Sequence, residues 1–447
     1  MWGGENISMS IKKIGTKYDL LINKLCAGAE TLYFIFFSVV IYKALLDFIY
    51  CQYIGGVHTF FGLEISIINI VNGWVSVIVF VPFIIQYYKQ KTCSAIIMIA
   101  LNMIYFIPIT TYCGYGGGSS SFLFFALVYW GVLSFLQLKI PMVTIKAKRN
   151  RCEDKIIWVF IVLVSAISLY IWWRYSGFRI QLNIIDVYGI RSEAAKNPMP
   201  SVLSYAWHIC TIIVPMLIVL MLYKKRYVVM VWLLFITLIN FSYAGNKSVI
   251  LFPVILIGGY VFYRRHMISL FFPLGVVVEI FAILEQKMGS MYITSFIFRR
   301  QGMVLAQLSE NYYRFFLENP TDIFRNSILG KFGFDSIYAN TLARVIGDNF
   351  ETQVVNCNNG LLADVWSGLG YIGLIIMPII LIVCFRLLDL AAYKVNPRMM
   401  IGLVLYYSIM FANTTWSTVL LTHGFIAMCI LLIIFPKKSN EVRELGI

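Results

Sequence analysis

About 12 apolar runs of membrane-spanning length follow one another along this chain, and they constrain its fold more than any other feature. Hydrophobic residues make up 60% of the 447 residues and charged residues 13%, which leaves too little polar surface for a soluble globule. The sequence therefore predicts an all-α polytopic membrane protein with about 12 transmembrane helices. The runs begin near Leu32, Ile65, Cys93, Phe122, Ile156, Leu203, Val228, Val249, Met267, Gly370, Met400 and Thr418.

Basic residues collect at every second connection between these runs. Because Lys and Arg resist translocation and gather in short cytoplasmic loops, the pattern predicts that both termini are cytoplasmic. These flanks also explain most of the net charge of +15, so we expect no nucleic-acid partner. The basic positions are Lys12, Lys13, Lys17, Lys24, Lys89, Lys91, Lys146, Lys148, Arg149, Arg151, Lys224, Lys225, Arg226, Arg264, Arg265, Lys394, Arg398, Lys437 and Lys438.

One connection is much longer than the others. It runs from Glu285 to Trp366, on the order of 80 residues, and the charge pattern predicts that it lies on the extracytoplasmic side. Aromatic runs, arginines and helix signals alternate within it, which is not typical of a flexible linker. We expect a helical cap over residues 286–366, inserted late in a single membrane domain of residues 1–447.

Two helices are predicted inside this cap. Thr321 is a suitable N-cap for a helix that continues to Leu329 and stops at Gly330. Asp335 is a suitable N-cap for a second segment that ends at Gly347 and carries one apolar stripe. Both helices would lie on the membrane body.

Several cationic side chains share the predicted outer side. The arginine guanidinium presents a fixed fork of donors that matches phosphate oxygens, so these residues suggest a phosphate-bearing or acidic ligand. They can equally anchor lipid headgroups or pair with loop carboxylates, and the sequence leaves both interpretations open. The candidates are Arg179, Arg191, Lys247, Arg299, Arg300 and Arg344.

Four sequence stretches occur in an order that carries a family resemblance. They are Asp186 to Arg191, the turn Gly245-Asn246-Lys247-Ser248, Asn311 to Phe316 followed by Asn319-Pro320, and Asn358 to Asp364 leading into Gly368-Leu369-Gly370. Together they resemble oligosaccharide repeat-unit polymerases of the Wzy (O-antigen or capsule) type. The arginine–glycine spacing of some of these polymerases is not met, because Arg179 and Gly189 are one residue too close.

The resemblance implies an inverting glycosyltransferase with GT-C-like architecture in the bacterial inner membrane, whose long loop is periplasmic. Such an enzyme transfers the growing glycan from undecaprenyl diphosphate onto an incoming repeat unit that is also linked to undecaprenyl diphosphate. The implied partners are these lipid-linked oligosaccharides, membrane lipids, and a chain-length regulator and a flippase of the same pathway. No cofactor is expected.

This chemistry needs a base for the acceptor hydroxyl and cations for the departing diphosphate. Asp186, Glu193 and Asp364 are the candidate bases, although Asp364 can instead cap a helix N-terminus. Tyr313 and Asn358 join the cations listed above as candidate glycan and diphosphate contacts. The first extracytoplasmic loop has no D-x-D or E-x-D triplet, so no metal is predicted.

Three alternatives remain open. One, a non-catalytic membrane assembly factor, is allowed by the composition but leaves the clustered outward arginines unexplained. A flippase or other transporter of lipid-linked oligosaccharides also has about 12 spans, but transporters are built from two related halves, and the long insertion has no counterpart in the first half. An O-antigen ligase has a similar topology, but the histidine that ligases carry in the long loop is absent, since the four histidines are His58, His208, His266 and His423.

Some ionisable residues fall inside predicted spans. Glu279 lies near the middle of its run, where a carboxylate normally faces a cavity or a partner, and it could line a substrate path. Lys43 and Asp47 are four residues apart, which puts them on one helix face as a structural pair or as outward-reaching charges.

Overall fold

The computed structural model describes residues 31–58, 61–143, 153–180, 187–263, 267–327, 329–350 and 356–436. Within these ranges the chain is all-helical, as predicted, and contains no strand. Ten helical segments there are long and apolar enough to cross a membrane, so the chain is a multi-pass membrane protein. They are Leu32–Ile54, Ile67–Gln90, Cys93–Tyr115, Ser120–Lys139, Asp154–Ser176, Ser201–Tyr223, Tyr227–Ala244, Ile268–Lys287, Gly370–Ala391 and Trp416–Ile434.

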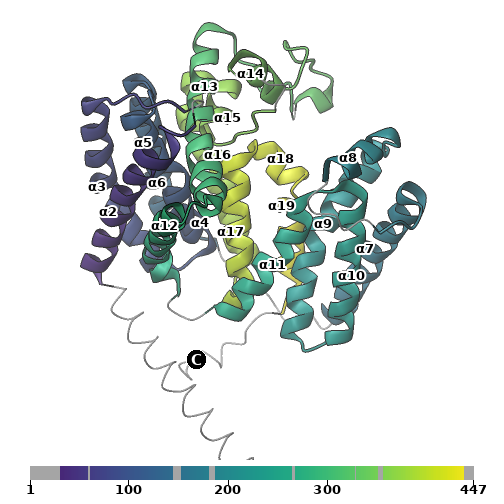
Figure 1. The fold of residues 1–447 in the computed structure, drawn as a ribbon. Helices are drawn as coiled ribbons and strands as arrows, with labels where there is room; N and C mark the ends of the chain where they lie inside the picture. The colour runs from purple at the N-terminus through teal and green to yellow at the C-terminus, as the bar shows by residue number, and fades with distance from the viewer. Residues whose placement is uncertain are drawn as a thin grey trace, which may run out of the picture. The chain divides into compact units, whose positions relative to one another are not determined.

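Two shorter helices occupy the remaining predicted spans. Helix α11 (Lys247–Phe262) has 16 residues and α17 (Pro397–Asn413) has 17. A Cβ on Gly259 would lie 2.9 Å from the backbone nitrogen of Gly402, so both positions require glycine. The rings of Phe252 and Tyr406 stack with centroids 3.8 Å apart. Helices α11 and α17 therefore pack backbone against backbone (Figure 1).

Contacts between residues divide the chain into two compact units. Unit 1 comprises Met1–Lys91, Met98–Trp130 and Arg264–Glu310, and unit 2 comprises Thr92–Ile97, Gly131–Tyr263 and Asn311–Ile447. Helices α4 (Cys93–Leu101), α6 (Ser120–Lys139) and α13 (Val304–Glu318) supply residues to both units. The other elements of unit 1 are α2 (Leu32–Ile49), η1 (Tyr50–Ile54), α3 (Ile67–Gln90), η2 (Asn102–Phe106), α5 (Ile107–Tyr115), η3 (Met267–Leu270), α12 (Phe271–Lys287) and η4 (Thr294–Met303).

In unit 1, α2 packs against α12 and α5. Tyr42 of α2 donates its hydroxyl hydrogen bond to the backbone oxygen of Met103 at 3.1 Å. Asn69 of α3 donates to the backbone oxygens of Cys113 and Gly118 at 3.1 and 2.9 Å. Ser120 donates to the same amide at 2.7 Å. A single buried asparagine therefore holds the end of α5 and the Gly/Ser turn that leads into α6.

In unit 2, α7 (Glu153–Ser176), α9 (Ser201–Tyr223) and α10 (Tyr227–Ala244) lie side by side (Figure 1). A buried polar network joins α4 and α6 to α16 (Gly373–Ala391). Ser94 donates its hydroxyl hydrogen bond to Asp389 and accepts hydrogen bonds from Arg386 and Gln137, both at 2.9 Å. Polar groups inside a bilayer must find partners within the protein, so this network fixes the three helices. The further elements of unit 2 are α8 (Val187–Lys196), η5 (Leu329–Phe332), α14 (Leu342–Phe350), α15 (Leu362–Gly368), η6 (Gly370–Ile372), α18 (Trp416–Leu421) and α19 (Phe425–Ile434).

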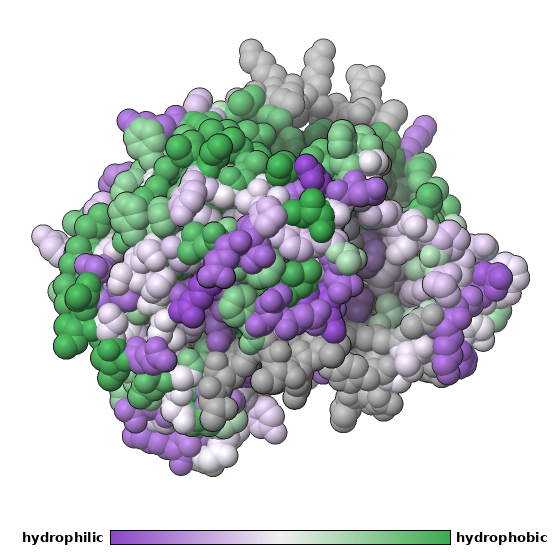
Figure 2. Space-filling model, turned by 90° about the horizontal axis from the view of Figure 1, so that it is seen from above, coloured by the Kyte–Doolittle hydropathy of each residue, from purple (hydrophilic) through white to green (hydrophobic). Residues whose placement is uncertain are grey.

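Large apolar side chains are exposed along the long helices. Phe37 on α2, Val79 on α3 and Val162 on α7 are each more than half exposed, as a surface in contact with lipid requires. The face seen in Figure 2 carries hydrophilic patches beside hydrophobic ones. Ends of helices in water and flanks of helices in lipid produce this mixture.

Candidate functional site

The candidate site is built around Asp364, a carboxylate that the sequence had already singled out. Asp364 lies on α15 and is 2% exposed. Its Oδ2 accepts the backbone N–H of Trp416 at 3.0 Å, and the carboxylate also accepts the backbone N–H of Leu361. Burial raises the pKa of Asp364 to about 8, against the opposing effect of these two hydrogen bonds. Asp364 therefore accepts backbone N–H groups at the starts of both α15 and α18. This is the helix-capping role that the sequence offered as the alternative to a catalytic base.

The segment before α15 passes very close to α17. The backbone N–H of Gly360 donates to the oxygen of Ala412 at 3.1 Å. A Cβ at Gly360 would lie 2.2 Å from the backbone oxygen of Phe411 and 2.4 Å from that of Thr414. Because both neighbours are backbone atoms, only glycine fits this crossing.

Two of the sequence stretches that carry the family resemblance contact each other in this region. The Tyr312 hydroxyl donates to the backbone oxygen of Cys357 at 3.1 Å, and the Tyr313 ring contacts Trp366 edge-to-face at 4.8 Å. Burial raises the pKa of Tyr312, and the neighbouring Asp364 adds to the effect. The stretch Asn311 to Phe316 therefore packs against the stretch that contains Asp364.

Helix α14 is attached to the same assembly. The backbone N–H of Cys357 donates to the oxygen of Ala343 at 2.9 Å. The next residue, Arg344, forms an ion pair with Asp348 at 2.8 Å on the outer side of α14. Asn358 is exposed beside this contact. The structure thus brings together four of the predicted site residues: Tyr313, Arg344, Asn358 and Asp364.

A turn around Asp322 supports this assembly, and sequence reasoning missed it. Asp322 is fully buried, and its backbone N–H donates to the oxygen of Ser367 at 2.9 Å. Its carboxylate accepts hydrogen bonds from the backbone of Asn326 and the hydroxyl of Ser336. An Asp soon after Asn319-Pro320 is a common turn signal, and it could have been recognised on that basis.

This turn replaces the first of the two helices predicted in the cap. Ile323 and Phe324 have φ angles of +50° and +59°, so a helix starting at Thr321 is wrong. Within the described part of this segment, only a short 3-10 turn, η5, is formed near Leu329. The second prediction is partly wrong, because α14 begins at Leu342 rather than after Asp335 and continues to Phe350.

Two predicted cations with described side chains, Arg179 and Lys247, belong to a second region of unit 2. Ile190 of α8 packs against Phe241 and Val249, which docks α8 beside the start of α11. Arg179 donates from Nε to the oxygen of Ser176 at 3.2 Å, and Lys247 is the exposed first residue of α11. Arg191 and Glu193 lie on α8, but their side chains are outside the described residues, and Asp186 is outside them entirely.

Arg299 and Arg300 belong to unit 1, on the π-helical segment η4. Arg300 is exposed, and Arg299 is partly buried. Among the described residues, the Nε atom of Arg299 is buried without a hydrogen-bond acceptor. A buried guanidinium N–H without an acceptor is costly, and an anionic ligand would satisfy it.

A polar cluster lies inside the spans of unit 1. Lys43 and Asp47 form the pair expected from their spacing, at 2.5 Å, and Thr111 of α5 donates to the same carboxylate at 2.7 Å. Glu279 of α12 is fully buried, and neither of its carboxylate oxygens has a hydrogen-bond partner among the described residues. Lys43 and Asp47 are therefore a structural pair rather than outward-reaching charges.

Replacing Asp364 by Asn is expected to change how stability depends on pH. The pKa of Asp364 rises from the ordinary 3.8 to about 8 on folding. The contribution of this group to the free energy of unfolding is therefore fully present below about pH 4, and it is lost as the pH rises through 8. The wild-type protein should lose up to about 1.4 kcal/mol per pH unit in this window through this group. Melting temperatures in detergent between pH 4 and 9 measure the effect, and Asp364→Asn should show a flatter profile. Parallel profiles for the two proteins would contradict the assignment.

In comparisons with known proteins, no protein-family model matches this chain, and neither a curated protein nor a solved structure matches it.

Proposed function

We propose that this chain is an oligosaccharide repeat-unit polymerase, a glycosyltransferase that joins undecaprenyl-diphosphate-linked repeat units. The observation that carries the proposal is the meeting of two family-like stretches in unit 2. Tyr312 and Tyr313 contact the segment of Cys357 to Trp366, and Arg344 and Asn358 lie on its outer side. The buried tyrosines hold this segment in place, and its exposed amide and the partly exposed arginine are groups that bind sugars and phosphates.

In this proposal α11 and α17 complete a set of about 12 spans with GT-C-like architecture. The basic residues at alternate connections orient the protein with both termini in the cytoplasm of a bacterium and the cap in the periplasm. Lipid-linked donor and acceptor reach the cap from the inner membrane, where their polyprenyl tails remain. A chain-length regulator and a flippase act in the same pathway.

Several residues share the roles that the glycan transfer requires. A carboxylate takes the proton from the acceptor hydroxyl as that oxygen attacks the anomeric carbon, and the undecaprenyl diphosphate departs with the bonding electrons. Asp186 and Glu193 are the bases of this proposal. Asp364 is a positioning residue, because its buried carboxylate holds two backbone segments. The cations proposed for the departing diphosphate are Arg191, Arg299, Arg300 and Arg344, and Arg179 and Lys247 are further candidate contacts.

The decisive experiment incubates the purified protein with a lipid-linked repeat unit and separates the products by length. We expect a ladder of glycans. Changing Arg191, Arg299, Arg300 and Arg344 together to Ala should reduce polymer formation at least about ten-fold, since charge-assisted hydrogen bonds to the diphosphate are lost. The control is Arg398→Ala, an exposed arginine at a predicted cytoplasmic connection, which should leave the ladder unchanged.

A glycan ladder that persists in the quadruple arginine variant would contradict the proposal that these arginines bind the diphosphate. Transport is the second candidate function, and the buried carboxylate of Glu279, which has no hydrogen-bond partner among the described residues, favours it, because ionisable groups inside spans often mark a pathway. If no authentic repeat unit is polymerised but the lipid moves between leaflets of a vesicle, the chain is a flippase.

A further inference from the structure

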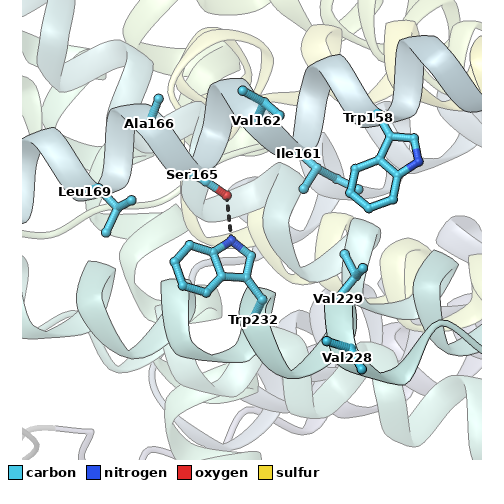
Figure 3. A pocket seen from close by; sticks show the side chains of 9 residues that line it. All are labelled: Trp158, Ile161, Val162, Ser165, Ala166, Leu169, Val228, Val229 and Trp232. Atoms are coloured by element: carbon cyan, nitrogen blue, oxygen red, sulfur yellow. Dashed lines mark hydrogen bonds between the residues drawn. The ribbon is translucent and has the colours of Figure 1, made fainter.

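An apolar groove runs between α7 and α10 of unit 2. Its volume is about 600 Å³, within the range of pockets that hold small ligands. Figure 3 shows the lining side chains of both helices, among them Trp158, Val162 and Leu169 from α7 and Val229 from α10. Trp232 reaches across and donates from Nε1 to Ser165 Oγ at 3.0 Å, which gives both polar groups a partner. Apart from the indole N–H of Trp158, the remaining wall is hydrocarbon.

One end of the groove carries a cluster of charges. Asp154 at the start of α7 pairs with Lys224 and with Arg226, the latter at 3.7 Å. The Arg226 guanidinium also lies 5.8 Å from the ring centroid of Trp158, a lining residue of the groove. Two cations share one carboxylate here, and the exposed Lys155 and Lys225 add further positive charge. Helices α7 and α10 both begin at this end, so their dipoles also favour an anion.

The length of the groove matches one leaflet of a bilayer. Trp158 and Leu169 are 11 positions apart on α7, which corresponds to about 16 Å at 1.5 Å per residue. Half of a hydrocarbon core of about 30 Å is about 15 Å. A hydrocarbon chain that enters the groove at the cationic end therefore reaches the bilayer midplane where the groove ends.

We propose that this groove binds one acyl chain of an anionic phospholipid, whose phosphate is held by Lys224 and Arg226. The apolar wall fits the chain, and the net positive charge at the mouth selects an anionic headgroup over a zwitterionic one. An undecaprenyl chain is much longer than one leaflet and would extend beyond the groove. This lipid site is independent of the proposed polymerase activity.

The test titrates the purified full-length protein in detergent with phosphatidylglycerol and with phosphatidylcholine of the same acyl chains, and bound lipid is counted by native mass spectrometry. Phosphatidylglycerol should bind at least about five-fold more tightly, the effect expected for one basic residue near a lipid headgroup. Changing Lys224 and Arg226 together to Gln should abolish this preference. Raising the salt concentration should weaken it.

A matched pair of variants tests whether the acyl chain of the lipid lies in the groove. Val162→Phe places a ring in the groove and should weaken binding of both lipids, whereas Leu163→Phe on the neighbouring exposed face of α7 should not. Phosphatidylglycerol brominated on its chains should quench tryptophan emission, and part of this quenching should vanish in Trp158→Phe/Trp232→Phe. Equal affinity for the two headgroups, unchanged binding in Val162→Phe, or displacement by an equal concentration of undecaprenyl phosphate would each overturn the proposal.

Discussion

Changing Lys43 to Met is expected to destabilise the protein by about 3–5 kcal/mol, the range measured when one partner of a buried ion pair is removed. Lys43 is 1% exposed and Asp47 is 6% exposed. Without the ammonium group, the Asp47 carboxylate keeps the hydroxyl of Thr111 but loses its counter-charge inside the span. Thermal unfolding in detergent, followed by circular dichroism, measures the loss.

Two controls make this prediction specific. Lys43→Met/Asp47→Asn removes both charges, so it should recover much of the stability that the single change loses. Lys139→Met removes an exposed lysine at the end of α6 and should cost less than about 1 kcal/mol. If the double variant is as unstable as Lys43→Met alone, the buried charge of Asp47 is not the cause.

Changing Gly360 to Ala is expected to cost about 3 kcal/mol or more, at the upper end of the range for overpacked sites. The added methyl group would lie within 2.4 Å of two backbone oxygens, which cannot rotate away as a side chain can. The segment carrying Asn358 would be pushed from α17, so the proposed polymerase activity should fall together with the melting temperature. Both are measured on the same purified sample.

Gly258→Ala is the matched control, because a Cβ at Gly258 of α11 meets no atom within 4 Å. Alanine is the better helix former by about 1 kcal/mol, so this variant should be neutral or more stable. A Gly360→Ala protein with unchanged melting temperature and polymer formation would show that the crossing of α17 is looser than described.

The features that were predicted correctly depend on residues close together in sequence. The long helices follow from apolar runs, and the Lys43–Asp47 pair follows from a spacing of one helical turn. The capping interpretation of Asp364 was also available, because an acidic residue near a helix start interacts with its N–H groups. Its second contact was not, because Trp416 is 52 residues away.

The cap shows why local signals fail. Thr321 and Gly330 are suitable ends for a helix, but Phe324 adopts a left-handed conformation instead. Its ring packs on Trp416 at 5.8 Å and occupies the space where Gly368 lacks a side chain. These contacts between distant segments outweigh the helical propensity of the intervening residues. The burial that raises the pKa of Asp364 likewise comes from segments that no local pattern identifies.

The short length of α11 has a consequence for the surrounding lipid. Its 16 residues measure about 24 Å, roughly 6 Å less than a typical hydrocarbon core. Leu251, Val254 and Phe262 are each more than half exposed, so lipid contacts this helix directly. Bilayers meet such a hydrophobic mismatch by thinning locally, at a cost of fractions of a kcal/mol per Å. We therefore expect a thinner membrane beside α11, where a polar headgroup has a shorter distance to travel between the two surfaces.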